Sequence, residues 1–199
     1  MLDFWFDFAS PYSYVASQRV EALCAEAGVP LRWRPFLLGP VFTAQLGIKD
    51  SPFNTQPVRG RYMWRDLSRL CEKYTLPFVK PESFPQRSLL AARVACVALD
   101  KPWCGDFVRG AFRATFQHGR DIATHATLGD VLSALGVDPA KVFPEAESEP
   151  VKRQLRAFTD EALALGIFGA PNAVIQQELF FGQDRLEDAV AWAKTHAVK

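Results

Sequence analysis

The chain has 199 residues, and its 23 Lys and Arg nearly balance 22 Asp and Glu, for a formal charge of +1. This length allows one domain with an insertion or two small domains, and 49% hydrophobic residues are enough for a buried core. The near-neutral charge gives no support for nucleic acid or an anionic membrane surface as a partner, because both attract proteins with a basic excess.

The first forty residues predict a strand, a helix and a second strand. Residues 2–8 are rich in aromatic side chains, which favours a strand. Ser10 and Pro11 suit the N-cap and first turn of a helix, and apolar residues recur at helical spacing over 12–27. Residues 31–36 alternate Leu, Trp and Phe, as a second strand does. This order predicts a βαβ unit with parallel strands and a right-handed crossover.

The middle of the chain predicts helices and no convincing strand. Gly, Pro, Asn and Thr are frequent over residues 38–57, which predicts a loop with one helical turn at 41–46. Residues 144–150 are acidic and bounded by proline, which predicts a loop before a helix over 151–165. Between these segments, helical patterns cover residues 61–73, 86–99, 103–116 and 127–135.

The end of the chain returns to a mixed pattern of strands and helices. Residues 166–171 are a Gly-rich bend. Two short strands are predicted over 172–175 and 179–181, joined by a hairpin turn. Asp184 suits the N-cap of a last helix over 185–196.

This order of elements is typical of an α/β protein with a thioredoxin-like fold and a large all-α insertion domain. Residues 1–40 and 150–199 are predicted to form the discontinuous thioredoxin-like domain, and residues 41–149 the α-helical insertion.

The cysteines argue against a redox or metal centre. Cys24, Cys71, Cys96 and Cys104 include no Cys-x-x-Cys pair, and only three His are present, so no metal site is predicted. Cys24 and Cys96 lie in apolar helical patterns and are expected to be buried, inert thiols. The chain starts without the basic flank of a signal peptide, and its longest apolar run is too short to cross a bilayer. We therefore predict a reduced, cytoplasmic protein.

The first candidate site is Ser10, with Pro11, Tyr12 and Ser13. In a βαβ unit the first helix begins at the carboxyl edge of the sheet, where unpaired backbone N–H groups and the positive end of the helix dipole gather. A thiolate or carboxylate at that point gains about 0.3–1 kcal/mol, and the serine hydroxyl can donate a hydrogen bond to it. The alternative is that Ser10 only caps the helix.

Two later loops are candidates for the same ligand. Pro171 opens a strand after a Gly-rich bend and is a candidate for a cis peptide bond. In a thioredoxin-like fold this bend faces the first helix, so the backbone of Ala170 could pair with an extended, peptide-like ligand. Gln183 and Asp184 could hold the carboxylate and amine of a γ-glutamyl group. The alternatives are an ordinary turn and an ordinary N-cap.

The insertion offers a third set, around Asn54. Arg61, Arg65 and Arg69 are four residues apart and share one helix face. Either this face is solvated, or one or two of the Arg, or Arg59, bind a carboxylate across the inter-domain cleft. A planar substrate could lie among aromatic residues that are otherwise core, namely Phe36, Phe42, Phe53, Trp64 and Phe84.

Five blocks of sequence together carry a resemblance that covers nearly the whole chain. They are residues 7–14 (DFASPYSY), 34–39 (RPFLLG), 61–67 (RYMWRDL), 166–171 (GIFGAP) and 181–185 (FGQDR). In this order they resemble the 2-hydroxychromene-2-carboxylate isomerases, which are similar to kappa-class glutathione transferases and belong to the DsbA-like thioredoxin superfamily. The oxidoreductases of that superfamily have Cys-x-x-Cys where Ser10 and Ser13 stand here, so disulfide exchange is excluded at this site.

The resemblance implies roles for the candidate residues. Ser10 would be the catalytic serine that contacts the sulfur of glutathione, the implied cofactor. Ala170, before Pro171, would pair its backbone with the cysteinyl unit, and Gln183 and Asp184 would hold the γ-glutamyl end. The same resemblance makes Asn54 a contact of cofactor or substrate.

The implied reaction is the interconversion of 2-hydroxychromene-2-carboxylate and trans-o-hydroxybenzylidenepyruvate in aromatic breakdown of the naphthalene type, and relatives suggest a homodimer. Two positions depart from the family pattern: Phe42 stands where a lysine would meet the substrate carboxylate, and Phe84 where a tyrosine would be convenient. Lys49, Arg59 or Arg61 could take the place of the lysine. A kappa-like transferase that consumes glutathione and a non-catalytic glutathione- or peptide-binding module are the alternatives.

Overall fold

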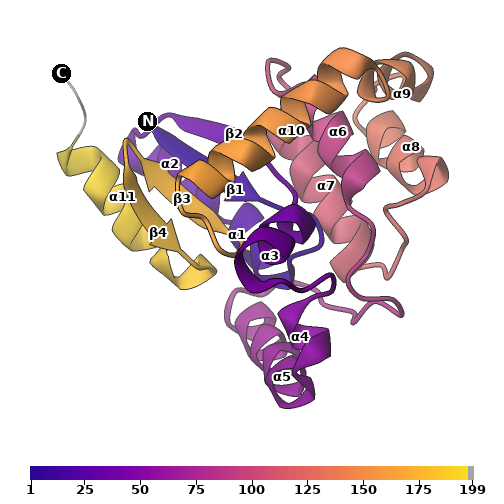
Figure 1. Cartoon of the computed structure of the whole chain (residues 1–199). Coiled ribbons are helices and arrows are strands. Elements are labelled where there is room, and N and C mark those ends of the chain that lie inside the picture. Colours follow the sequence, from indigo (N-terminus) through magenta and orange to yellow (C-terminus); the bar gives the residue numbers. More distant parts are fainter. Residues whose placement is uncertain (197–199) are drawn as a thin grey trace.

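The computed structural model describes residues 1–196 and is built on a four-stranded sheet with helices on both faces (Figure 1). The strands are β1 (Leu2–Phe6), β2 (Leu31–Pro35), β3 (Asn172–Ile175) and β4 (Glu178–Phe181), in the order β2-β1-β3-β4. β1 and β2 are parallel, whereas β3 is antiparallel to both β1 and β4. This topology confirms the predicted thioredoxin-like α/β fold.

The helix predicted over residues 12–27 is in fact two helices. α1 (Pro11–Ser17) ends at Gln18, and α2 (Val20–Ala27) begins after Arg19. The guanidinium of Arg19 reaches the backbone oxygen of Gln183, 164 residues along the chain, and lies over the ring of Tyr74. The break between α1 and α2 thus coincides with tertiary contacts of Arg19, which the helical periodicity of the sequence cannot indicate.

The prediction of a loop over residues 38–57 is wrong, because most of this segment is helical. α3 (Leu38–Leu46) and α4 (Pro52–Thr55) lie within it, and α5 (Pro57–Lys73) starts at its end. The side chain of Ser51 caps α4 by accepting the backbone N–H of Phe53. The first N–H of α3 is accepted by the Asp7 carboxylate, which comes from the distant end of β1.

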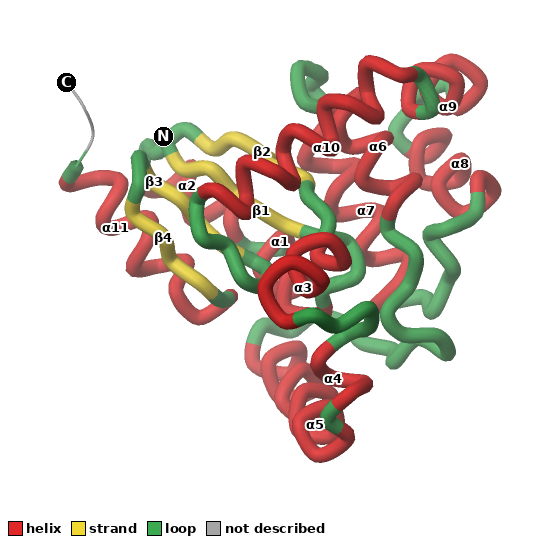
Figure 2. Tube along the Cα trace, viewed as in Figure 1, coloured by secondary structure: helices red, strands yellow, loops and turns green. Residues whose placement is uncertain are grey.

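The rest of the insertion is helical, as predicted, but the loop predicted over residues 144–150 is also wrong. Asp138 caps a helix that continues through Pro144, and the next helix starts at Glu149. The helices of this part are α6 (Leu89–Ala98), α7 (Cys104–Phe116), α8 (His125–Ala134), α9 (Pro139–Ala146) and α10 (Glu149–Ala164). Figure 2 shows how they extend the molecule beyond the β2 edge of the sheet.

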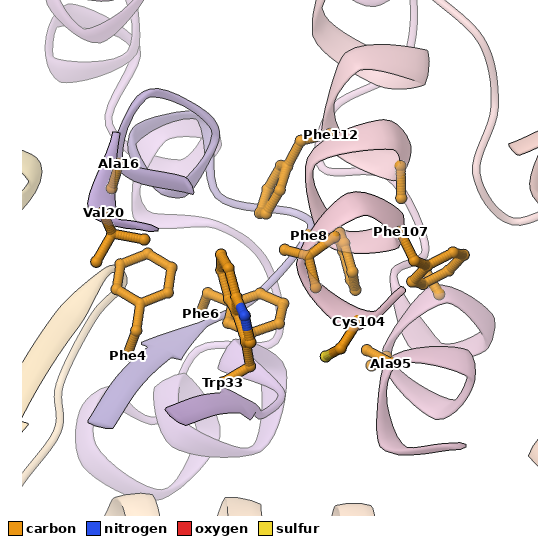
Figure 3. Close-up of a cluster of buried hydrophobic side chains, with 14 of the residues drawn as sticks. Phe4, Phe6, Phe8, Ala16, Val20, Trp33, Ala95, Cys104, Phe107 and Phe112 are labelled. Atoms are coloured by element: carbon orange, nitrogen blue, oxygen red, sulfur yellow. The ribbon is translucent and has the colours of Figure 1, made fainter. Parts of the chain in front are cut away.

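The sheet and the insertion share one hydrophobic core (Figure 3). The ring of Phe8 lies 4.9 Å from that of Phe112 and 6.2 Å from that of Phe107, both on α7. On the opposite face of the sheet, Trp5 packs with Phe36 in a second cluster against α3 and α10. The division into residues 1–40 with 150–199 and residues 41–149 stays a prediction, since both parts contribute to the same core.

The C-terminal part begins with the predicted hairpin and ends on a helix. A short 3₁₀ helix, η1 (Gln183–Arg185), precedes α11 (Leu186–Thr195). The prediction that Asp184 is the N-cap of the last helix is wrong, because Asp184 lies inside η1 and Arg185 is the N-cap of α11. The N-cap of η1 is Gly182, with φ of 112°. Among residues 1–196, no helix combines the length and the apolar character needed to cross a membrane.

Candidate active site

Ser10 is the N-cap of α1 and lies at the carboxyl end of β1. Its Oγ accepts a hydrogen bond from the Ser13 backbone N–H at 3.2 Å and donates one to the Ala170 carbonyl oxygen at 2.9 Å. Ser10 is 5% exposed, so the hydroxyl is close to the surface without being open to bulk water. The predicted cap is confirmed, and the single hydroxyl proton points at Ala170.

The loop opposite Ser10 carries the predicted cis proline. The Ala170–Pro171 peptide bond is cis, and the Pro171 carbonyl accepts the backbone N–H of Gly182 at 3.0 Å. Behind this loop, the buried side chain of Asn172 donates to the Gly169 carbonyl at 2.7 Å. The structure thus brings the predicted cofactor residues Ser10, Ala170 and Pro171 together and places the start of η1 beside them.

Gln183 and Asp184 differ in what they leave free for a ligand. The Gln183 side chain is buried, and its amide oxygen accepts a hydrogen bond from the Arg19 guanidinium. Arg19 also pairs with Glu187 on α11. The groups left for a ligand are the backbone N–H groups at the start of η1, since the first donors of a helical turn lack acceptors within it, and the exposed side chain of Asp184.

Asp7 is a buried residue beside Ser10 that was not among the predicted site residues. Its carboxylate is 2% exposed and accepts the backbone N–H groups of Ala9 at 2.9 Å and Leu38 at 2.7 Å. Burial raises the pKa of this carboxyl, although these hydrogen bonds and one from Ser88 oppose the rise. The signal in the sequence was an acid in a position otherwise occupied by buried aromatics.

Tyr12 is a second residue whose role was missed. Its hydroxyl donates to the Asp66 carboxylate on α5 at 3.1 Å, and its ring lies 6.4 Å from that of Phe53 on α4. Burial and the neighbouring Asp66 raise the pKa of the Tyr12 phenol, so it stays protonated. The guanidinium of Arg59 lies over the Phe53 ring at 5.5 Å. Tyr12 therefore connects the helix that carries Ser10 to α4 and α5.

The predicted substrate residues fall into separate groups. The Asn54 amide donates to the Phe84 carbonyl at 3.0 Å, so these two lie together. Phe42, on α3, packs against the cluster that contains Ala170. Arg61 is exposed on α5. Two shallow surface depressions border on α5, and neither is lined by Ser10 or Ala170.

The thiols of the chain lie in the core. All four cysteines are free and buried. Burial raises the pKa of Cys24 and Cys71 to about 11 and that of Cys96 and Cys104 to about 12. Within residues 1–196, no group of three or more His, Cys, Asp or Glu is arranged to hold a metal ion.

The arrangement around Ser10 suits a small thiol-containing peptide. The hydroxyl of Ser13, one turn into α1, is fully buried and has no hydrogen-bond partner among the described residues. A thiolate at the start of α1 would meet the Ser10 hydroxyl and the positive end of the helix, while a peptide backbone could run along Ala170. The site can therefore lower the pKa of a bound thiol without a thiol of its own.

Known proteins of two kinds are similar to this chain over nearly its full length. "Glutathione s-transferase kappa 2" of Caenorhabditis elegans is 29% identical, covering 94% of this chain and 88% of that protein. A "2-hydroxychromene-2-carboxylate isomerase" of Sphingobium xenophagum is 27% identical over 94% of each chain. Both names are those of enzymes.

A solved structure of a 2-hydroxychromene-2-carboxylate isomerase superposes with a TM-score of 0.87 at 25% identity, covering 98% of this chain and 94% of the other. The family model of the DSBA-like thioredoxin domain matches residues 1–191. Because that match spans almost the whole sequence and agrees with the strand order, the chain belongs to the DsbA-like thioredoxin domain family.

Proposed function

We propose that the chain is a glutathione-dependent isomerase that interconverts 2-hydroxychromene-2-carboxylate and trans-o-hydroxybenzylidenepyruvate, as part of the breakdown of naphthalene-type aromatic compounds. The observation that carries the proposal is the Ser10 hydroxyl at the N-terminus of α1, opposite Ala170, in a family whose redox members use cysteine at this point. The solved isomerase structure described above shares its fold with this chain over 98% of the residues.

The residues of the chain would divide the work as follows. Ser10 donates a hydrogen bond to the bound sulfur, Ala170 aligns the peptide backbone, and the N–H groups of Gln183 and Asp184 hold a carboxylate. Glutathione, held by these residues, would supply a nucleophilic thiolate whose reversible addition to the ring-opened substrate would permit rotation about the former double bond without net consumption of the thiol. The dipole of α1 and the Ser10 hydroxyl favour the charged form of that sulfur.

Ser10 must change its hydrogen bond to do this. Its only proton is given to the Ala170 carbonyl, while the Ser13 N–H already occupies one of its lone pairs. Stabilising a sulfur anion therefore requires rotation of the hydroxyl away from Ala170. The exchange replaces one neutral hydrogen bond by a stronger, charge-assisted one, so the rotation is favourable once an anion is present.

A second candidate is a kappa-type transferase that conjugates glutathione to a different electrophile. It is favoured by the apolar side chains at Phe42 and Phe84, neither of which can bind a carboxylate or a phenol. In this reaction the thiol is consumed, because the carbon–sulfur bond that forms is not broken again. The concentration of free thiol therefore distinguishes the two reactions, because it stays constant during isomerisation and falls during conjugation.

The experiment is an ultraviolet assay of 2-hydroxychromene-2-carboxylate with the protein, with and without glutathione, while free thiol is counted. Formation of the trans enone that depends on glutathione at constant thiol supports the isomerase. Loss of thiol without isomerisation moves the assignment to the transferase. Glutathione binding without either change contradicts the isomerase and leaves a transferase for a different electrophile or a non-catalytic binding module.

We also propose that the protein acts as a homodimer in the cytoplasm on a small aromatic substrate. Sedimentation of the pure protein tests the dimer, and fractionation of the cells that make it tests the compartment. A monomer at micromolar concentration would contradict the first proposal.

A further inference from the structure

Helix α3 contacts both loops of the site, one at each of its ends. We propose that α3 is a brace that sets the spacing between the Ser10 loop and the Ala170 loop, with Asp7 and Gln45 as positioning residues. The role assigned to the brace in binding glutathione rests on the proposed function, whereas its role in holding the loops does not. Figure 2 shows α3 crossing the end of the sheet in front of α1.

The first anchor is the Asp7 carboxylate. One oxygen accepts the N–H of Ala9, next to Ser10, at 2.9 Å, and the other accepts the N–H of Leu38, the first residue of α3, at 2.7 Å. The Asp7 carbonyl accepts the N–H of Ser10 itself at 2.9 Å. One buried side chain therefore joins the start of α3 to the loop that carries the catalytic serine.

The second anchor lies at the other end of the helix. The Gln45 amide donates to the Ile167 carbonyl at 3.0 Å, three residues before Ala170. Between the anchors, Leu38 and Val41 pack in the same cluster as Ile167 and Ala170. The apolar side of α3 thus supports the loop that its last turn also holds by a hydrogen bond.

The spacing matters because the two loops meet through a single side-chain hydrogen bond. Ser10 Oγ and the Ala170 carbonyl oxygen are 2.9 Å apart, and a shift of an ångström would break this contact. Residues 38 to 45 span about 10 Å of helix at 1.5 Å per residue. A helix of this length is stiff, so its two anchors fix the two loops relative to each other.

Two variants, each with a control, test the brace. Gln45→Ala removes the exposed anchor and leaves the core intact. Thr43→Ala is its control, because this exposed hydroxyl on the same helix bonds only to Gly39 and Ile48 nearby. Asp7→Asn weakens the buried anchor. Its control, Asp121→Asn, alters a carboxylate with the same geometry towards Ala123, at 2.9 Å, far along the chain.

The readouts are amide hydrogen exchange in peptides that cover residues 5–14 and 166–173, and the dissociation constant for glutathione. Loss of one net hydrogen bond predicts about three- to tenfold faster exchange over residues 166–170 in Gln45→Ala. The dissociation constant for glutathione should rise by a similar factor. Asp7→Asn should speed exchange in both peptides by about tenfold or more, because the amide NH2 that replaces one carboxyl oxygen cannot accept the backbone N–H that this oxygen accepts. Both controls should match the wild type.

Unchanged exchange over residues 166–170 in Gln45→Ala overturns the brace, and this variant decides the matter even if Asp7→Asn does not fold. Anchors about 10 Å apart act additively when they are independent. In Asp7→Asn combined with Gln45→Ala, a brace predicts an effect smaller than the product of the two single effects. If the wild type binds no glutathione, the proposed function fails, while the exchange rates still decide the brace.

Discussion

Replacing Ser10 with alanine separates the chemistry of the serine from its part in stability. The hydroxyl makes two hydrogen bonds, one from the Ser13 N–H at 3.2 Å and one to the Ala170 carbonyl at 2.9 Å. Loss of a helix cap lowers the free energy of unfolding by about 1 kcal/mol, and loss of a second hydrogen bond by about 1 kcal/mol more. If Ser10 also stabilises charge on the bound sulfur, the turnover rate should fall about 10²-fold or more.

Thr124 provides a closely matched control. It is the N-cap of α8, where its hydroxyl accepts the Thr127 N–H at 3.2 Å and donates to the Asp121 carbonyl at 3.0 Å. Thr124→Ala therefore removes the same two kinds of contact at an exposed cap away from Ser10, together with a hydrogen bond to the Thr127 hydroxyl. Urea unfolding should show a similar loss of stability in both variants.

Only the Ser10 variant should lose activity, measured as glutathione-dependent isomerisation or as thiol consumption. Its dissociation constant for glutathione should rise much less than its turnover rate falls, because Ala170 and the start of η1 remain in place. The reasoning is refuted if Ser10→Ala retains turnover within about threefold of the wild type. Equal loss of activity in Thr124→Ala would assign the effect to stability alone.

Three further perturbations test other parts of the structure. Ser10→Cys places a thiol at the start of α1, where its pKa is lowered; mass spectrometry should find one mixed disulfide after exposure to oxidised glutathione, and none on the wild type, whose own cysteines are buried. Burial raises the pKa of the Asp7 carboxyl above its ordinary 3.8. The stability that Asp7 confers relative to Asp7→Asn should therefore be full below pH 3.8 and be lost as pH rises through the raised pKa. Urea unfolding of both proteins across the acid range checks this, and a stability advantage of the wild type that grows with pH would contradict it. A Cβ on Gly60 would lie 2.2 Å from the Phe53 carbonyl oxygen, so Gly60→Ala should destabilise the protein by about 2 kcal/mol or more. Gly39 on α3 faces open space, so Gly39→Ala should stabilise the protein by about 0.5–1 kcal/mol. Thermal unfolding that ranks the two variants the other way would refute the packing of α4 on α5.

Features that depend on neighbouring residues could be predicted from the sequence. The cap at Ser10 is an example, because Pro11 follows it at once and the strand before it is plainly aromatic. The bend before Pro171 is another, since glycine and proline restrict the backbone whatever surrounds them. These local signals were sufficient for the order of elements in the thioredoxin-like part and for the cis bond before Pro171.

Features that depend on distant residues could not be predicted. α3 was expected to be mostly loop because Gly, Pro, Asn and Thr are frequent in that segment. The acceptor of its first N–H is Asp7, 31 residues earlier in the chain, and this contact could not be read from the local sequence. Asp184 matches the pattern of an N-cap, but it lies inside a 3₁₀ turn whose first residue, Gln183, accepts a hydrogen bond from Arg19, 164 residues earlier in the chain. Tyr12 belongs to the predicted motif around Ser10, but its contact with Asp66 could not be predicted, since Asp66 lies on another helix. The local motif at Ser10 and the bend at Ala170 and Pro171 were thus predictable, whereas the contacts that join them to the insertion were not.

The shared core of the sheet and α7 bears on which parts of the protein can move apart. Phe8 and Phe112 are fully buried against each other, and exposing two such rings would require about 10 kcal/mol at 200 Å² per ring. A hinge between the sheet and α7 would then be open in about one molecule in 10⁷. The first half of α5 differs, because Val58 is 73% exposed and Tyr62 61% exposed. The sheet and α7 are therefore expected to move as one unit, whereas the exposed side chains of α5 can change position without opening this core.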